Sequence, residues 1–336
     1  MTIALAVLIL IAVVFDFMNG FHDSSNIVAT MISSRTFTGR QALAIVTVGE
    51  TVGPFLFGVA VAKTIGQDVV SGDTVTLAVV IAALLGAVAW NFITWWLGIP
   101  SSSSHALIGG IVGAVMVEHG FGPIKMDGMR TVLLALFLSP IIGLVVGFIF
   151  QRLLLHALVA AKAGPRANKF FRVGQFFTAI GLALSHGTND AQKTMGMITM
   201  GLVATGFQSE FHVPWWVMCI SAAAIGAGTA TGGWRLIKTL GFRLYKIWPI
   251  HAFSSQVSSG MVILTAALLG GPVSTTQVVS GVILGAGASE NARKIRWKIA
   301  GNIVIAWFLT IPCAGLVAAG MYFVVKLLMP FPGGTP

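Results

Sequence analysis

Ten apolar segments follow one another along the whole chain and leave only short polar stretches between them. Within each segment the residues do not alternate between apolar and polar, as the strands of a membrane β-barrel would. Only 9% of the residues are charged, whereas about a quarter is usual in a soluble domain. The pattern therefore predicts an all-α polytopic membrane protein. The segments are 3–30, 41–62, 74–97, 101–117, 131–155, 173–206, 214–233, 248–270, 273–288 and 299–325.

The basic residues lie mainly in the stretches between apolar segments and give the chain a net charge of +10. Such clusters are typical of loops on the cytoplasmic face, so the charge does not indicate nucleic acid as a partner. If the N-terminus lies outside the cell, 15 of the 20 Lys and Arg residues fall in loops on the cytoplasmic side. Lys193 lies within an apolar segment and is counted on neither side. We therefore predict a multi-pass protein with both termini outside. The four outer basic residues are Lys63, Lys125, Arg130 and Lys326.

Two motifs occur twice, in the same order, on either side of a basic stretch at 156–172. The first is GFHDSSN at 20–26 and GTNDAQK at 187–193; the second is GIPSSSSH at 98–105 and GGPVSTTQ at 270–277. Because each half has five segments, an odd number, the halves must have opposite orientations. The prediction is an inverted-topology repeat of the kind found in secondary transporters. Its parts are a first repeat at 1–155, a basic cytoplasmic linker at 156–172 and a second repeat at 173–330.

The second motif places a run of hydroxyl residues within a few positions after a proline. Proline suits the first turn of a helix, and the N–H groups and dipole of a helix N-terminus attract anions. Two such tips would surround one tetrahedral oxyanion with hydroxyl and amide donors. Residues 74–117 and 248–288 either cross the membrane fully or form re-entrant helical hairpins, and we favour the hairpins. The candidate anion ligands are Ser102, Ser103, Ser104, Ser274, Thr275 and Thr276.

The first motif places an aspartate and an amide deep in an apolar segment of each half, as Asp23 with Asn26 and Asp190 with Asn189. An ionisable residue at membrane depth is costly and indicates a functional site. Carboxylate and amide oxygens suit a small cation, and a carboxylate also accepts a proton. Asp16 falls on nearly the same helix face as Asp23, two turns earlier, and belongs either to the same polar path or to the outer interface.

Several other polar residues lie within the apolar segments. Glu50 has no acidic counterpart in the second half and is a candidate proton or cation relay, while Lys193 either pairs with a carboxylate or meets the anion. For each of these residues, packing between helices is an equally good explanation. The further candidates are His22 and Gln192 for coupling, and His105, His186 and Gln277 as ligands.

These motifs resemble those of the PiT family of inorganic phosphate transporters, over nearly the whole chain. The resemblance implies import of phosphate with a co-transported cation, the inverted-repeat fold, a homodimer in membrane lipid and the inner (plasma) membrane of a bacterium. It places Asp23, Asn26, Asn189 and Asp190 around the ion and phosphate centre, as sodium ligands if sodium is the coupling ion. It places the hydroxyls of 102–104 and 274–276 on the phosphate. The bound ligands would be phosphate and Na⁺ or H⁺, with no cofactor.

The chain departs from the family pattern at two positions. His22 stands where sodium-coupled members tend to have Asn, as at Asn189, and resembles bacterial members that use protons or carry neutral metal–phosphate. Gln277 stands where a histidine is common. The coupling ion therefore stays open between proton and sodium.

The sequence favours a secondary active phosphate symporter over three other hypotheses. The first keeps the fold but changes the cargo to sulfate, another oxyanion or a metal–phosphate complex. The second is a passive channel, which buried carboxylates suit poorly. The third is an intramembrane hydrolase built on the serines at 101–104 and His105, but the equivalent of His105 is Gln277, so the symmetry favours binding over catalysis. We therefore expect a protein that is not an enzyme.

Overall fold

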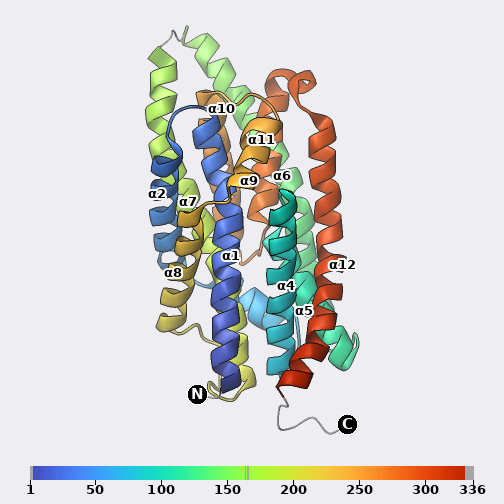
Figure 1. The fold of residues 1–336 in the computed structure, drawn as a ribbon. Coiled ribbons are helices and arrows are strands. Elements are labelled where there is room, and N and C mark those ends of the chain that lie inside the picture. Colours follow the sequence, from blue (N-terminus) through green and yellow to red (C-terminus); the bar gives the residue numbers. More distant parts are fainter. Residues whose placement is uncertain (1–2, 163, 165, 330–336) are drawn as a thin grey trace.

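The computed structural model describes residues 3–162, 164 and 166–329, and that part of the chain is built almost entirely from helices (Figure 1). The all-α prediction is confirmed. Within the same residues the β-structure consists of one isolated bridge between Val70 and Ile124. The long helices are α1 (Ile3–Ser33), α2 (Gly39–Val52), α4 (Leu77–Leu97), α5 (Ser103–His119), α6 (Met126–Ala160), α7 (Arg166–Ala204), α8 (Trp215–Thr231), α10 (Pro249–Leu268), α11 (Thr275–Asn291) and α12 (Trp297–Leu328).

Two of the predicted segments are broken or extended, contrary to expectation. The segment at 41–62 is not one helix, because α2 ends before Pro54 and the chain bends by 69° into a short helix over 60–68. The segment at 214–233 continues beyond Gly232, whose φ is +71°, through a bend of 58° into helical turns over 234–243. Hydropathy does not mark the first bend, since the predicted segment is apolar on both sides of it. The second bend comes where the apolar segment ends and the basic residues Arg235, Lys238 and Arg243 begin. The short helices are α3 (Ala60–Lys63) and α9 (Trp234–Lys238).

The region predicted as a linker at 156–172 is largely helical where it is described. Helix α6 runs on to Ala160 and α7 begins at Arg166, whereas residues 163 and 165 of the predicted linker lie outside the described residues. Residue 330, the predicted end of the second repeat, also lies outside them.

Four helices of the described chain, α1, α4, α6 and α12, are long and apolar enough to cross a membrane. The number rises to six if each bent pair is one span. Helix α7 is the longest but is not among them, because a row of polar residues occupies its second half. The outward-facing residues of α6 and α12 include many large apolar side chains, as expected of a surface in contact with lipid.

Helices α4 and α5 form one hairpin and α10 and α11 form another, and the two hairpins enter the molecule from opposite ends (Figure 1). The turns follow Gly98 and Gly270, whose φ values of +68° and +74° lie in the region that glycine adopts without strain. The tips meet in the middle, where the Ser104 hydroxyl donates to the Val273 carbonyl at 3.0 Å. That these hairpins are re-entrant in a bilayer stays a prediction.

Equivalent helices of the two halves make equivalent contacts. Helix α5 packs on α12 and α11 packs on α6 through glycines: a Cβ on Gly109 would lie 2.3 Å from the Ile311 carbonyl oxygen, and one on Gly281 would lie 2.4 Å from that of Pro140. Helices α1 and α7 run in opposite directions, as do α6 and α12 (Figure 1). These relations fit an inverted repeat, which itself stays a prediction.

Candidate functional site

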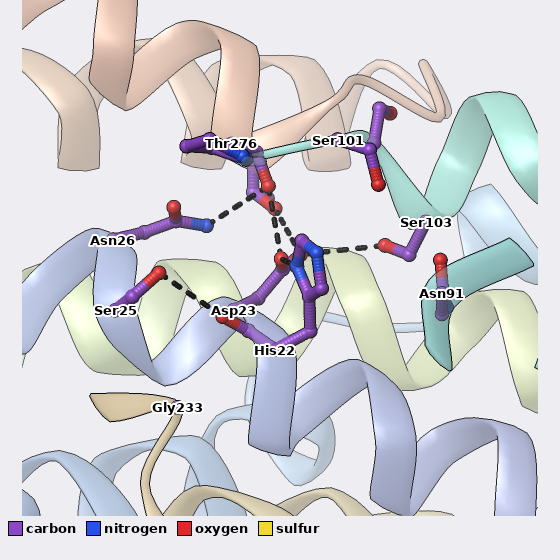
Figure 2. A network of polar contacts seen from close by, with 12 residues as sticks. His22, Asp23, Ser25, Asn26, Asn91, Ser101, Ser103, Gly233 and Thr276 are labelled. Carbon is purple, nitrogen blue, oxygen red and sulfur yellow. Dashed lines mark hydrogen bonds and ion pairs between the residues drawn. The ribbon is translucent and has the colours of Figure 1, made fainter. Parts of the chain in front are cut away.

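Asp23 lies in the middle of α1, where the tips of both hairpins reach it (Figure 2). The imidazole of His22, the preceding residue, lies 2.8 Å from its Oδ1. Three hydroxyl groups from the tips contact the same carboxylate. They belong to Ser103 at 3.3 Å, Thr275 at 3.3 Å and Thr276 at 2.9 Å. The carboxyl is buried, so its charge is balanced by these neighbours rather than by water.

Asp190 occupies the corresponding place on α7, and its Oδ2 lies 3.0 Å from the same Thr275 hydroxyl. Lys193, one turn later, donates to its other oxygen, and the His186 ring lies 3.6 Å away. Both basic side chains are buried. The structure thus brings together two aspartates that the sequence places in separate halves.

The hairpin tips present helix N-termini to this cluster. The side chains of Ser102 and Ser274 cap α5 and α11, accepting from the backbone N–H of His105 at 3.1 Å and of Gln277 at 3.3 Å. Their hydroxyl oxygens are therefore engaged in capping, and Ser104 is turned toward the other tip. The first N–H groups of a helix have no acceptor within the helix, so each tip offers amide donors and a positive dipole end.

Two amides lie at the edge of the cluster with their oxygens free. Asn26 donates through Nδ2 to Thr276 at 3.2 Å, and Asn189 donates to the Gly271 carbonyl at 3.2 Å. Within the described residues, the Oδ1 atoms of both have no hydrogen-bond partner although they are buried. Together with the two aspartates they supply hard oxygen ligands of the kind that bind small cations.

A second layer of charge lies behind Asp190. The Nδ1 of His186 is 3.0 Å from Glu50 Oε1, and the Thr229 hydroxyl donates to the other oxygen of Glu50. Ligand atoms of Asp23, His186 and Asp190 lie within 4.8 Å of one another, close enough to hold a metal ion. The pairing of Glu50 with His186 depends on the packing of α2 against α7, for which the sequence carries no local signal beyond the polarity of each residue.

Gln192 does not contact the two aspartates of the cluster and lies instead against the start of α3. Its Oε1 accepts from the backbone N–H of Val61 at 2.8 Å and of Ala62 at 3.3 Å, which holds the first turn of α3. Gln277 and His105, the equivalent last positions of the two tips, lie beside each other, with Gln277 Nε2 3.4 Å from His105 Nε2. His105 Nδ1 lies 2.8 Å from Ser102 Oγ, but no carboxylate contacts the ring in the part of the chain described, so a hydrolytic triad is not formed.

A helical membrane fold with a buried centre of carboxylates, hydroxyls and helix N-termini is typical of secondary transporters. Residues 19–318 match the model of the Phosphate transporter family, and the chain therefore belongs to that family.

Several known proteins are similar to this chain over nearly its whole length. A probable low-affinity inorganic phosphate transporter of Rhizobium meliloti is 41% identical over 322 residues, 96% of each chain. One of Bacillus subtilis with the same description is 42% identical over 330 residues, 96% of this chain and 98% of the relative. A solved structure, described as the sodium-dependent phosphate transporter, aligns with a TM-score of 0.87 and 22% identity over 98% of this chain and 100% of its own. That likeness shows a shared fold.

Proposed function

We propose that this chain imports inorganic phosphate by symport with a cation. The observation that carries the proposal is the contact of one hydroxyl, that of Thr275, with both Asp23 and Asp190. A hydroxyl has one hydrogen and donates to one carboxylate at a time. The carboxylate that does not receive this hydrogen keeps an acceptor oxygen directed to the centre, beside its partner Lys193 or His22, and can take a proton or a small cation there. A cation held between the two carboxylates would reduce the negative charge that the anion meets.

The electrostatics of the centre then couple cation and anion. Phosphate at the tips of α5 and α11 would receive donors from the hydroxyls of Ser103, Thr275 and Thr276 and from the helix N-termini. The same hydroxyls contact carboxylates, which repel an anion. A bound cation removes part of that repulsion, so each ligand strengthens the binding of the other, and the linkage is reciprocal.

The carboxylates also favour phosphate over sulfate as the cargo. Near neutral pH phosphate keeps at least one O–H group, which donates to a carboxylate, whereas sulfate has none. The proximity of Asp23, His186 and Asp190 supports one specific alternative, in which phosphate enters as a complex with a divalent metal held by these residues. Proton, sodium and metal–phosphate are therefore the three forms of coupling to be compared.

Movement of the two hairpins relative to α1 and α7 would expose the centre to each side in turn. The first turn of α1 and the last turn of α12 lie at one end of the molecule (Figure 1), in agreement with termini on one side. That this side is the outside, that the membrane is a bacterial inner membrane and that the protein is a homodimer are further parts of the proposal. The transporter names of the relatives favour a protein without enzymatic activity.

The test is uptake of radiolabelled phosphate by proteoliposomes containing the purified chain, with sodium and proton gradients imposed separately. We expect one gradient to drive concentrative uptake, and we expect Asp23→Asn and Asp190→Asn to abolish it. Asp127→Asn, at an exposed position in the first turn of α6, is the matched control. Uptake at the wild-type level in both site variants, or stronger competition by sulfate than by unlabelled phosphate across a pH series, would overturn the proposal.

A further inference from the structure

Four acidic residues are buried among the described residues, and three of them have a basic partner in direct contact. His22 lies 2.8 Å from Asp23, His186 lies 3.0 Å from Glu50, and Lys193 pairs with Asp190. The fourth is Asp16, on α1, which forms no ion pair with any described residue.

The surroundings of Asp16 are polar but uncharged. Asn19 lies one turn later on the same face of α1, and the Thr194 hydroxyl of α7 faces the carboxyl. Apart from this approach of the Thr194 hydroxyl to Asp16, neither the Asp16 carboxyl nor either amide atom of Asn19 has a hydrogen-bond partner within the described residues. All three side chains are fully buried. The charged groups that act on Asp16 from farther away are Asp190, Lys193 and Glu50.

The two halves differ in the residues that precede their Asp motifs. When the two Asp motifs are aligned on Gly20 and Gly187, His186 falls opposite Asn19 and Ala183 falls opposite Asp16. The second half thus supplies a histidine that pairs with a buried acid, whereas the first half supplies a neutral amide at the same place. Asp16 therefore has no basic side chain in direct contact among the described residues, and the cation nearest in effect, Lys193, is already paired with Asp190.

We propose that Asp16, Asn19 and Thr194 form a second cation site, separate from the aspartates of the centre, which carries one monovalent cation with each phosphate. An ionised carboxylate without a partner is too costly to bury, so the group must hold a proton or a small cation. Carboxylate, amide and hydroxyl oxygens are the hard ligands that an alkali cation prefers, and a proton needs only the carboxyl. This inference rests on the proposed phosphate symport.

The proposed cation site at Asp16 lies close enough to the centre to affect binding of the anion. Asp16 lies seven residues before Asp23 on one continuous helix, which corresponds to about 10 Å along its axis. At that distance, inside a protein, a charge still interacts with the centre, because screening by water and salt is weak there. Neutralisation of Asp16 by a cation therefore favours binding of phosphate at the tips.

The experiment measures the number of positive charges moved with each phosphate, from reversal potentials of proteoliposomes containing the full chain. Asp16→Asn is expected to lower this number by one while leaving exchange of labelled for unlabelled phosphate in place. The exposed variant Asp127→Asn is expected to leave it unchanged. Separate proton and sodium gradients identify the ion, because only the response to the ion held by Asp16 should weaken.

Thr194→Val keeps the side-chain volume and serves as the second variant, whether or not Asp16→Asn folds. It should raise the half-saturating concentration of the coupling cation roughly tenfold, the effect typical of removing a group that supports a bound ion. An unchanged half-saturating concentration in Thr194→Val, or an unchanged charge number in a folded Asp16→Asn, would overturn the inference. Failure of the proposed function is distinguishable, since the wild-type protein would then move no phosphate under any gradient.

Discussion

Asp23 and Asp190 share a single hydroxyl group, that of Thr275, which lies 3.3 Å from one carboxylate and 3.0 Å from the other. The first residue of α11 is thereby in contact with the polar middle of both α1 and α7. Any displacement of this hairpin tip changes the surroundings of both carboxylates at once. In the proposed symport, Thr275 is therefore the residue through which binding of the anion and binding of the cation affect each other.

Replacement of this hydroxyl by a methyl group, in Thr275→Val, should raise the half-saturating phosphate concentration. A hydrogen bond to a charged group contributes about 1.5–3 kcal/mol, so the expected increase is roughly 10- to 100-fold. Kinetics of phosphate uptake in proteoliposomes measure it.

The control for this change is Thr310→Val. The Thr310 hydroxyl is buried too, but it donates to the Ala306 carbonyl of its own helix, far along the sequence from either motif. Equal effects of the two substitutions would show that a general loss of packing, rather than the shared contact, lowers the affinity.

The centre of the site could be predicted from the sequence because it is duplicated. Asp23 and Asp190 occur in matched motifs, and each lies deep in an apolar segment. A charged side chain is costly at such a position and therefore indicates a functional site. The caps formed by Ser102 and Ser274 could not be told apart from anion ligands, since a hydroxyl at a helix N-terminus fits either role. Only the direction of each side chain separates the two.

The contact of Glu50 with His186 and the two helix bends could not be predicted from the sequence. Glu50 and His186 come from helices that meet only in the folded chain, and neither has a counterpart of its own type in the other half. The bend that follows Phe55 lies inside a segment that is apolar on both sides. Hydropathy records how apolar a stretch is but not where its axis turns, so such features depend on tertiary packing.

The buried pair of Lys193 and Asp190 should be strongly coupled in stability. Lys193→Met leaves an uncompensated carboxylate in the interior, which costs about 3–5 kcal/mol in comparable pairs. The double variant with Asp190→Asn should recover most of that loss, because the buried charge is then removed as well. Thermal unfolding in detergent of the wild type, both single variants and the double variant measures the coupling.

Lys63→Met, at the exposed last residue of α3, is the control for loss of a lysine and should change stability little. Additive effects in the cycle of Lys193 and Asp190 would contradict the ion pair. The same proteins should lose phosphate uptake whether or not stability is recovered, since the centre would have lost a charged group.

The glycines at the helix crossings should tolerate no side chain. A Cβ on Gly113 would lie 2.1 Å from the Gly315 carbonyl oxygen, and one on Gly285 would lie 2.0 Å from that of Leu144. Each helix would have to move away, so Gly113→Ala and Gly285→Ala should destabilise the protein by about 1–3 kcal/mol. Gly320→Ala, with open space around the added Cβ, should not, and thermal unfolding that ranks all three equally would count against this packing.

The identity of the coupling ion should depend on His22. Its imidazole lies 2.8 Å from Asp23 Oδ1 and takes the place at which the second motif has the amide of Asn189. In His22→Asn the carboxylate loses its basic neighbour and gains a hard oxygen ligand, so the first motif should bind sodium better. We expect a sodium gradient to stimulate phosphate uptake more strongly in this variant than in the wild type, and a proton gradient to stimulate it less. His156→Asn, at an exposed position of α6, controls for loss of an imidazole. If His22→Asn responded to both gradients as the wild type does, then His22 would have no part in selecting the ion.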